Sequence, residues 1–182
     1  PELAGQGRRV LRLGAITALG GAAGAAVLLA TPASTFTFVV PVLIGAASLV
    51  LLAQPRIRHL APAAGQRPRL AHHLALFAVA MYVGYFGAAA GVMLLVVLSV
   101  MIEESLIKIN AVKNAVSGMA NAMAATCFAF FGDVRWALVA PLAAGFLIGG
   151  WIGPKIDRRV PPGVFRIFVG LCGIGLAVKL GI

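Results

Sequence analysis

The chain has 182 residues, of which 61% are hydrophobic and 11% are charged, and its formal net charge is +10. A soluble domain of this composition would expose too much apolar surface, so a soluble fold is excluded. The apolar residues form long blocks without strand-like alternation, which favours spanning helices over a β-barrel. We therefore expect an all-α polytopic membrane protein with no nucleic-acid partner, whose basic residues act as topology signals.

Two uncharged blocks of spanning length predict the first helices, at about 10–30 and 36–53. Basic residues precede the first helix and follow the second, so the positive-inside tendency places both ends of this pair in the cytoplasm. We accordingly divide the chain into the end of a first repeat at 1–60 (two transmembrane helices), a basic cytoplasmic loop at 61–73, and a second repeat at 74–182.

A longer uncharged run extends from Leu74 to Ile102. A straight helix of that run would be roughly 43 Å long, against about 30 Å for a hydrocarbon core. Gly87 and Gly91 bracket its middle, where glycine permits a turn. We expect two half-helices, at about 74–86 and 92–102, that enter the membrane and return as a re-entrant hairpin. One long, tilted and kinked helix is the alternative.

Three further helices are expected at about 109–131, 137–154 and 164–180. The helix at 109–131 is expected to cross the membrane once. The last two helices are expected to form a second hairpin, in addition to the one formed by the first two helices. The turn of this second hairpin carries Lys155, Arg158 and Arg159, so it is expected in the cytoplasm.

The two spanning hairpins are internal copies, because residues 19–53 align without a gap on residues 148–182. The aligned positions include a matching glycine cluster: Gly20, Gly21 and Gly24 fall on Gly149, Gly150 and Gly153. The turn is uncharged in the first copy and basic in the second, so the copies point in opposite directions. Such inverted repeats are typical of secondary transporters, whose substrate site lies at the midplane between the halves.

The start of the second half-helix is the first candidate site. Unpaired N–H groups there would attract an anion, and small residues would let it approach the backbone. The candidate residues are Tyr85, Gly87, Ala88, Ala89, Ala90, Gly91 and Val92. Helix packing is the competing role for the glycines, and packing or an interfacial position competes for Tyr82 and Tyr85.

A polar stripe on the helix at 109–131 is the second candidate site. Its members recur at helical spacing on one face, with Lys113 at the margin: Asn110, Asn114, Ser117 and Asn121. Ionisable groups inside a membrane usually mark function, so we expect Lys113, Asn114, Ser117 and Asn121 to bind an anionic substrate. Helix packing by the amides, or snorkelling of Lys113 to the membrane surface, is the competing interpretation.

Catalytic machinery is not evident in the sequence. There is no Ser/His/Asp set, no carboxylate pair at membrane depth, no phosphate-binding loop and no His/Cys cluster at metal-ligand spacing. We therefore expect no enzyme activity, no catalytic residue, no metal site and no cofactor.

Three stretches resemble the sulfite exporter TauE/SafE family of membrane transporters: GYFGAAAG at 84–91, the Asn/Lys-containing helix and turn at 109–136, and the closing hairpin at 149–180. The resemblance implies transport of sulfite, an organosulfonate or a related sulfur or carboxylate anion. The resemblance also implies that the first repeat has a hairpin and a polar helix of its own. The first-repeat residue equivalent to Gly87 would fall before residue 1, so we expect an N-terminally truncated chain.

Together these features predict a multi-pass transporter of a small anion in the cell (inner or plasma) membrane, working by alternating access. Its expected partners are the anion, the lipid bilayer and the missing N-terminal repeat half, and a homo-oligomer is left open. A non-transporting membrane scaffold or assembly subunit is the alternative.

Overall fold

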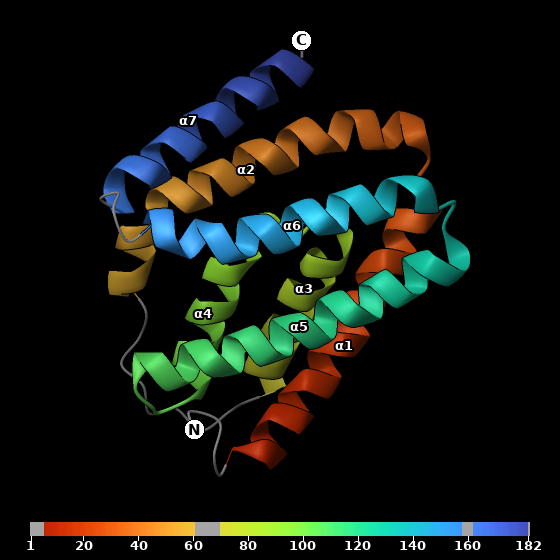
Figure 1. The fold of residues 1–182 in the computed structure, drawn as a ribbon. Helices are drawn as coiled ribbons and strands as arrows, with labels where there is room; N and C mark the ends of the chain where they lie inside the picture. Colours follow the sequence, from red (N-terminus) through yellow and green to blue (C-terminus); the bar gives the residue numbers. More distant parts are fainter. Residues whose placement is uncertain (1–5, 61–69, 158–161, 182) are drawn as a thin grey trace.

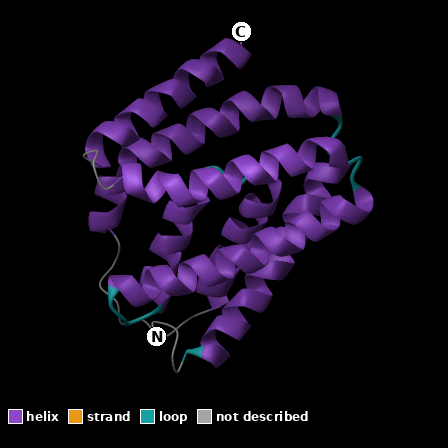
Figure 2. Ribbon diagram, in the orientation of Figure 1, coloured by secondary structure: helices purple, strands orange, loops and turns teal. Residues whose placement is uncertain are grey.

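The computed structural model describes residues 6–60, 70–157 and 162–181, and within these ranges it contains helices and short loops but no strand (Figure 2). In chain order the helices are α1 (Gly7–Ala30), α2 (Ala33–Leu60), α3 (Leu70–Tyr85), α4 (Ala90–Met101), α5 (Leu106–Phe131), α6 (Trp136–Asp157) and α7 (Pro162–Gly181). The all-α fold class is confirmed.

Several helices are longer than the apolar blocks that predicted them. α1 begins at Gly7 instead of near residue 10, and α2 continues to Leu60 instead of ending near residue 53. α3 begins at Leu70, so residues 70–73 of the expected loop are helical, while residues 61–69 lie outside the described residues. The apolar pattern marks the turns that avoid water, whereas polar side chains can continue a helix beyond them.

Three of the described helical stretches are long and apolar enough to cross a membrane: Gly7–Ala30, Ser34–Ala53 and Trp136–Gly153. α3, α4 and the stretch Ile167–Leu180 are shorter apolar helices. α5 belongs to neither group because its polar stripe lowers its mean hydropathy. The single crossing expected of α5 therefore stays a prediction.

α1 packs against both α3 and α5 through small residues (Figure 1). A Cβ on Gly21 would overlap the carbonyl oxygen of Ala120 on α5, and a Cβ on Gly84 of α3 would overlap the carbonyl oxygen of Gly21. Between α1 and α5, the Thr17 hydroxyl donates to the Val116 carbonyl at 2.9 Å. Close approach of small residues is the usual way for helices to associate within a bilayer.

The relative directions of the helices follow from these contacts. Thr17 meets Val116 and Gly21 meets Ala120, so α1 and α5 run in parallel. On the other side of the molecule α2 packs antiparallel on α7, where Leu52 lies against Gly170 and Gly45 against Ala177. The predicted membrane topology requires both of these relative directions.

The α2–α7 pair also supports the inverted repeat. Ile44 and Gly173 are equivalent positions in the repeat alignment, and a Cβ on Gly173 would lie 4.0 Å from Cγ2 of Ile44. When two copies are related by a two-fold axis, equivalent residues meet where that axis passes between them. The crossing of α2 and α7 therefore lies where the axis relating the repeats would pass.

The α3–α4 hairpin occupies the centre of the molecule (Figure 1). Leu76 of α3 and Leu94 and Leu98 of α4 have no exposed surface, and they belong to a core cluster shared with α1 and α5. α4 also contacts α2, so the hairpin connects the α2–α7 pair to the rest of the fold. This burial holds the turn of the hairpin in a fixed position.

α6 has no extensive contact with another helix in the described part of the chain, and its described side chains from Trp136 to Gly153 are all exposed. Gly149, Gly150 and Gly153 have no atom within 4 Å of an added Cβ. Their repeat counterparts on α1 are Gly20, Gly21 and Gly24, which pack tightly against α3 and α5. The same glycine cluster is thus covered in one copy and bare in the other.

Candidate functional site

The uncharged run is broken between Tyr85, where α3 ends, and Ala90, where α4 begins. The Tyr82 carbonyl accepts hydrogen bonds from the N–H groups of Phe86 at 2.9 Å and Gly87 at 3.0 Å, which closes α3. Gly87 then adopts φ 75° and Ala89 φ 56°, both in the left-handed region. Glycine makes the first of these conformations inexpensive, whereas Ala89 adopts the second at a cost of roughly 1 kcal/mol or more.

The chain turns back at this break. His73, near the start of α3, and Ile102, after the end of α4, line the same cavity as Arg12 near the start of α1. Both ends of the hairpin therefore lie beside the same end of α1, and Figure 1 shows α3 and α4 side by side. The alternative of one long kinked helix is excluded for this chain.

The turn faces a cavity of about 220 Å³ between α2 and α7. Ala88 and Ala89 line it together with Ser48 of α2 and Gly173 of α7. Ser48 and Gly173 lie close to the middle of their helices. The break therefore meets the α2–α7 pair at mid-length, beside the place where a two-fold axis relating the repeats would pass.

The backbone of the turn is less open than the sequence suggested, because three of its N–H groups have backbone acceptors. Gly87 donates to Tyr82, Ala90 donates to Gly87 at 3.4 Å and Val92 donates to Ala89 at 3.0 Å. The N–H groups of Ala88, Ala89 and Gly91 have no acceptor among the described residues. The expectation of unpaired N–H groups throughout 87–92 is thus wrong for three positions, because the turn forms local hydrogen bonds.

The two tyrosines have different places in the structure. The Tyr82 hydroxyl donates to the Ala88 carbonyl at 2.8 Å and so fixes the turn against α3. Tyr85 lines a separate cavity of about 210 Å³ with Val27 of α1. The tyrosine whose hydroxyl bonds to the turn is therefore Tyr82, whereas the sequence analysis placed Tyr85 among the candidate residues.

Lys113 of α5 reaches the start of α4. Its Nζ lies 4.0 Å from the position that a Cβ on Gly91 would take, and the side chain is half-buried. The ammonium group is therefore close to the amide of Gly91 and to the positive end of the α4 dipole.

The rest of the polar stripe does not converge on the turn. Asn114 and Asn121 are exposed, and the Asn121 side-chain amide donates a 3.4 Å hydrogen bond to the Ser117 hydroxyl. At 3.6 residues per turn the stripe lies about 110° around α5 from the face buried on α1 and the hairpin. Among the described helices, nothing covers this face of Asn114 and Asn121.

A centrally buried broken helix, a cavity at its turn and an antiparallel helix pair beside it indicate the class of helical membrane transporters with inverted repeats. The family model described as Sulfite exporter TauE/SafE matches residues 3–180, so the chain belongs to this family. It is accordingly a membrane transporter and not an enzyme. No curated protein and no solved structure gives a significant match.

Proposed function

We propose that this protein carries a small anion across the cell membrane by alternating access, as a multi-pass protein with the domain limits given above. The observation that carries the proposal is the break at 87–91, which presents three N–H groups without acceptors and has the Lys113 ammonium beside it. Backbone N–H groups and a cation can replace the hydration shell of an anion. Rocking of the two repeats would then open the site to either side.

The substrate that fits these groups best is a small oxyanion. Sulfite, an organosulfonate or a related sulfur or carboxylate anion offers several acceptor oxygens to N–H donors that lie close together. The cavity of about 220 Å³ at Ala88 and Ala89 is otherwise apolar, with Ser48 as its one polar side chain. The Ser48 hydroxyl donates to the Ile44 carbonyl at 2.8 Å, so recognition depends on the backbone and on Lys113.

The polar stripe of α5 completes the site once its open face is covered. Gly21 and Gly24 of α1 receive α5 and α3, and their counterparts Gly150 and Gly153 on α6 have no neighbour within the described residues. By the repeat symmetry, a first-repeat hairpin and polar helix would pack on α6 as α3 and α5 pack on α1. This counterpart would bring a second broken helix toward Asn114 and Asn121.

A flux assay tests the transport proposal. The full-length protein in liposomes should move sulfite or sulfoacetate, and replacing Asn114 and Asn121 by Leu should lower the flux about tenfold or more with normal membrane insertion. Thr126→Leu is the matched control, because the Thr126 hydroxyl bonds within α5 to Ala122 at 2.8 Å. If the wild-type protein moves neither anion and the Asn114 and Asn121 replacements affect only assembly, the transport proposal is contradicted and the scaffold alternative is supported.

The bare glycine face of α6 has its own test. Gly150→Leu should block the packing of a first-repeat counterpart and abolish flux, although the position has open space within the described residues. Gly175→Leu on α7 is the control, since Gly175 is also exposed with nothing within 4 Å. Equal flux from both variants would contradict the proposed packing and leave the site at Ala88 standing.

A further inference from the structure

Another cavity lies at the other end of α4 from the glycine break. It has a volume of about 280 Å³ and lies between the first turns of α1 and α3 and the end of α4. α4 extends over roughly 17 Å between Ala90 and Met101 at 1.5 Å per residue. The cavity is therefore separate from the turn at Ala88, and the proposed transport site does not use it.

The lining of this cavity has two parts. Arg8, Arg12 and His73 supply basic groups around it. Leu13 and Ile102, which are 5% and 2% exposed, supply an apolar floor. A cationic rim above an apolar floor matches a ligand with an anionic head and an apolar body.

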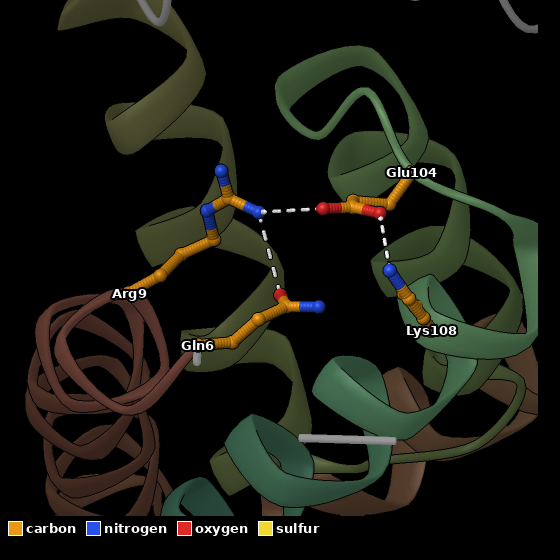
Figure 3. Close-up of polar contacts among 4 residues, drawn as sticks. All are labelled: Gln6, Arg9, Glu104 and Lys108. Atoms are coloured by element: carbon orange, nitrogen blue, oxygen red, sulfur yellow. Dashed lines mark hydrogen bonds and ion pairs between the residues drawn. The ribbon is translucent and has the colours of Figure 1, made fainter. Parts of the chain in front are cut away.

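Among the described residues, few acidic groups balance the arginines at this place. α1 has no acidic residue in its first turn, so Arg8 and Arg9 lie at the positive end of its dipole, where cations are unfavourable. Arg9 donates to the Gln6 side chain at 3.3 Å and lies 3.9 Å from the Glu104 carboxylate (Figure 3). Glu104 also bonds Lys108 at 3.0 Å, so one carboxylate serves two cations.

Arg8 and Arg12 have no ion pair within the described residues, in contrast to Arg9. Guanidinium groups bind sulfonate and phosphate oxygens in a bidentate manner, which suits two neighbouring arginines.

We propose that this basic pocket binds a sulfonate or phosphate headgroup attached to an apolar group. Arg8 and Arg12 hold the headgroup oxygens, and Leu13 and Ile102 contact the apolar part. The same chemistry is offered by a water-soluble organosulfonate and by the headgroup of an anionic phospholipid, and the two sources differ in whether the ligand enters from water or from the bilayer.

The experiment measures binding to the full-length protein, first in lipid-free detergent with hexanesulfonate and then in nanodiscs with or without phosphatidylglycerol. The variants are Arg8→Gln combined with Arg12→Gln, the charge-conserving Arg12→Lys, and Arg135→Gln as a control in the loop between α5 and α6. A melting curve for each variant shows that it is folded. If the double variant does not fold, Arg8→Gln alone carries the test.

The pocket predicts that wild type and Arg135→Gln bind at least one of the two probes, and that the double variant or Arg8→Gln binds it about tenfold or more weakly. The affinity of Arg12→Lys should lie between that of wild type and that of the double variant, because lysine retains the positive charge but cannot make the bidentate contact of a guanidinium group. Binding of hexanesulfonate assigns a soluble ligand, and selective retention of phosphatidylglycerol assigns a lipid. Failure of both probes to bind wild type, or equal binding by all variants, would overturn the proposal even if transport is intact.

Discussion

Replacing Gly84 by Ala should destabilise the protein, because α3 packs closely against α1 at Gly84. A Cβ at this position would overlap the Gly21 carbonyl oxygen and lie 2.8 Å from its carbonyl carbon and 2.9 Å from its Cα. All three are backbone atoms, so no side-chain rotation relieves the clash and the helices must separate. Overpacking of this kind costs about 1–3 kcal/mol, against at most about 1 kcal/mol gained from the helix propensity of alanine.

With the full alanine gain subtracted, the net loss is up to about 2 kcal/mol, which corresponds to a melting temperature up to roughly 8 °C lower for a chain of this size. Far-UV circular dichroism of the detergent-purified protein measures it. Gly118→Ala on α5 is the matched control, because a Cβ at Gly118 would meet nothing within 4 Å. If Gly84→Ala melts at or above the temperature of Gly118→Ala, the described packing of α1 on α3 is wrong.

Three further predictions use the same melting assay. Gly87→Ala should lower and Ala89→Gly should raise the melting temperature, each through about 1 kcal/mol of left-handed backbone strain; shifts of the same sign would contradict the described turn. Thr17→Val should cost about 1 kcal/mol by removing a buried hydrogen bond to α5, whereas Thr126→Val, at an exposed bond within one helix, should have little effect. Glu104→Gln should cost at most about 1 kcal/mol, and a loss that persists in high salt would count against its ion pairs.

The hairpin could be predicted from sequence because two independent constraints agreed. The run from Leu74 to Ile102 is too long for one straight span. In addition, the first hairpin is expected to end inside, the second to begin outside, and α5 to supply one crossing, so the run must cross the membrane an even number of times. Gly87 then marked the only part of the run where a turn was inexpensive. The left-handed φ of Ala89 could not be predicted in the same way, because alanine normally avoids that conformation and only the surrounding packing imposes it.

Which side chains of different helices come together was harder to predict than the fold. Helical spacing placed Lys113 at the margin of the polar stripe, and its proximity to Gly91 depends on how α5 packs against α4. The glycine cluster of α1 was interpreted only as a mark of the repeat, and its packing against α3 and α5 was not predicted. The pocket around Arg8 and Arg12 was missed, because its basic residues were interpreted only as topology signals.

The most direct test of the transport site is the accessibility of the turn. Ala88→Cys, in a background with Cys127→Ser and Cys172→Ser, is treated in liposomes with a membrane-impermeant anionic thiol reagent. We predict that the cysteine is modified, and that sulfoacetate slows its modification. A cysteine that the reagent reaches from neither side, or that is modified at the same rate with and without sulfoacetate, would contradict an anion site at this break.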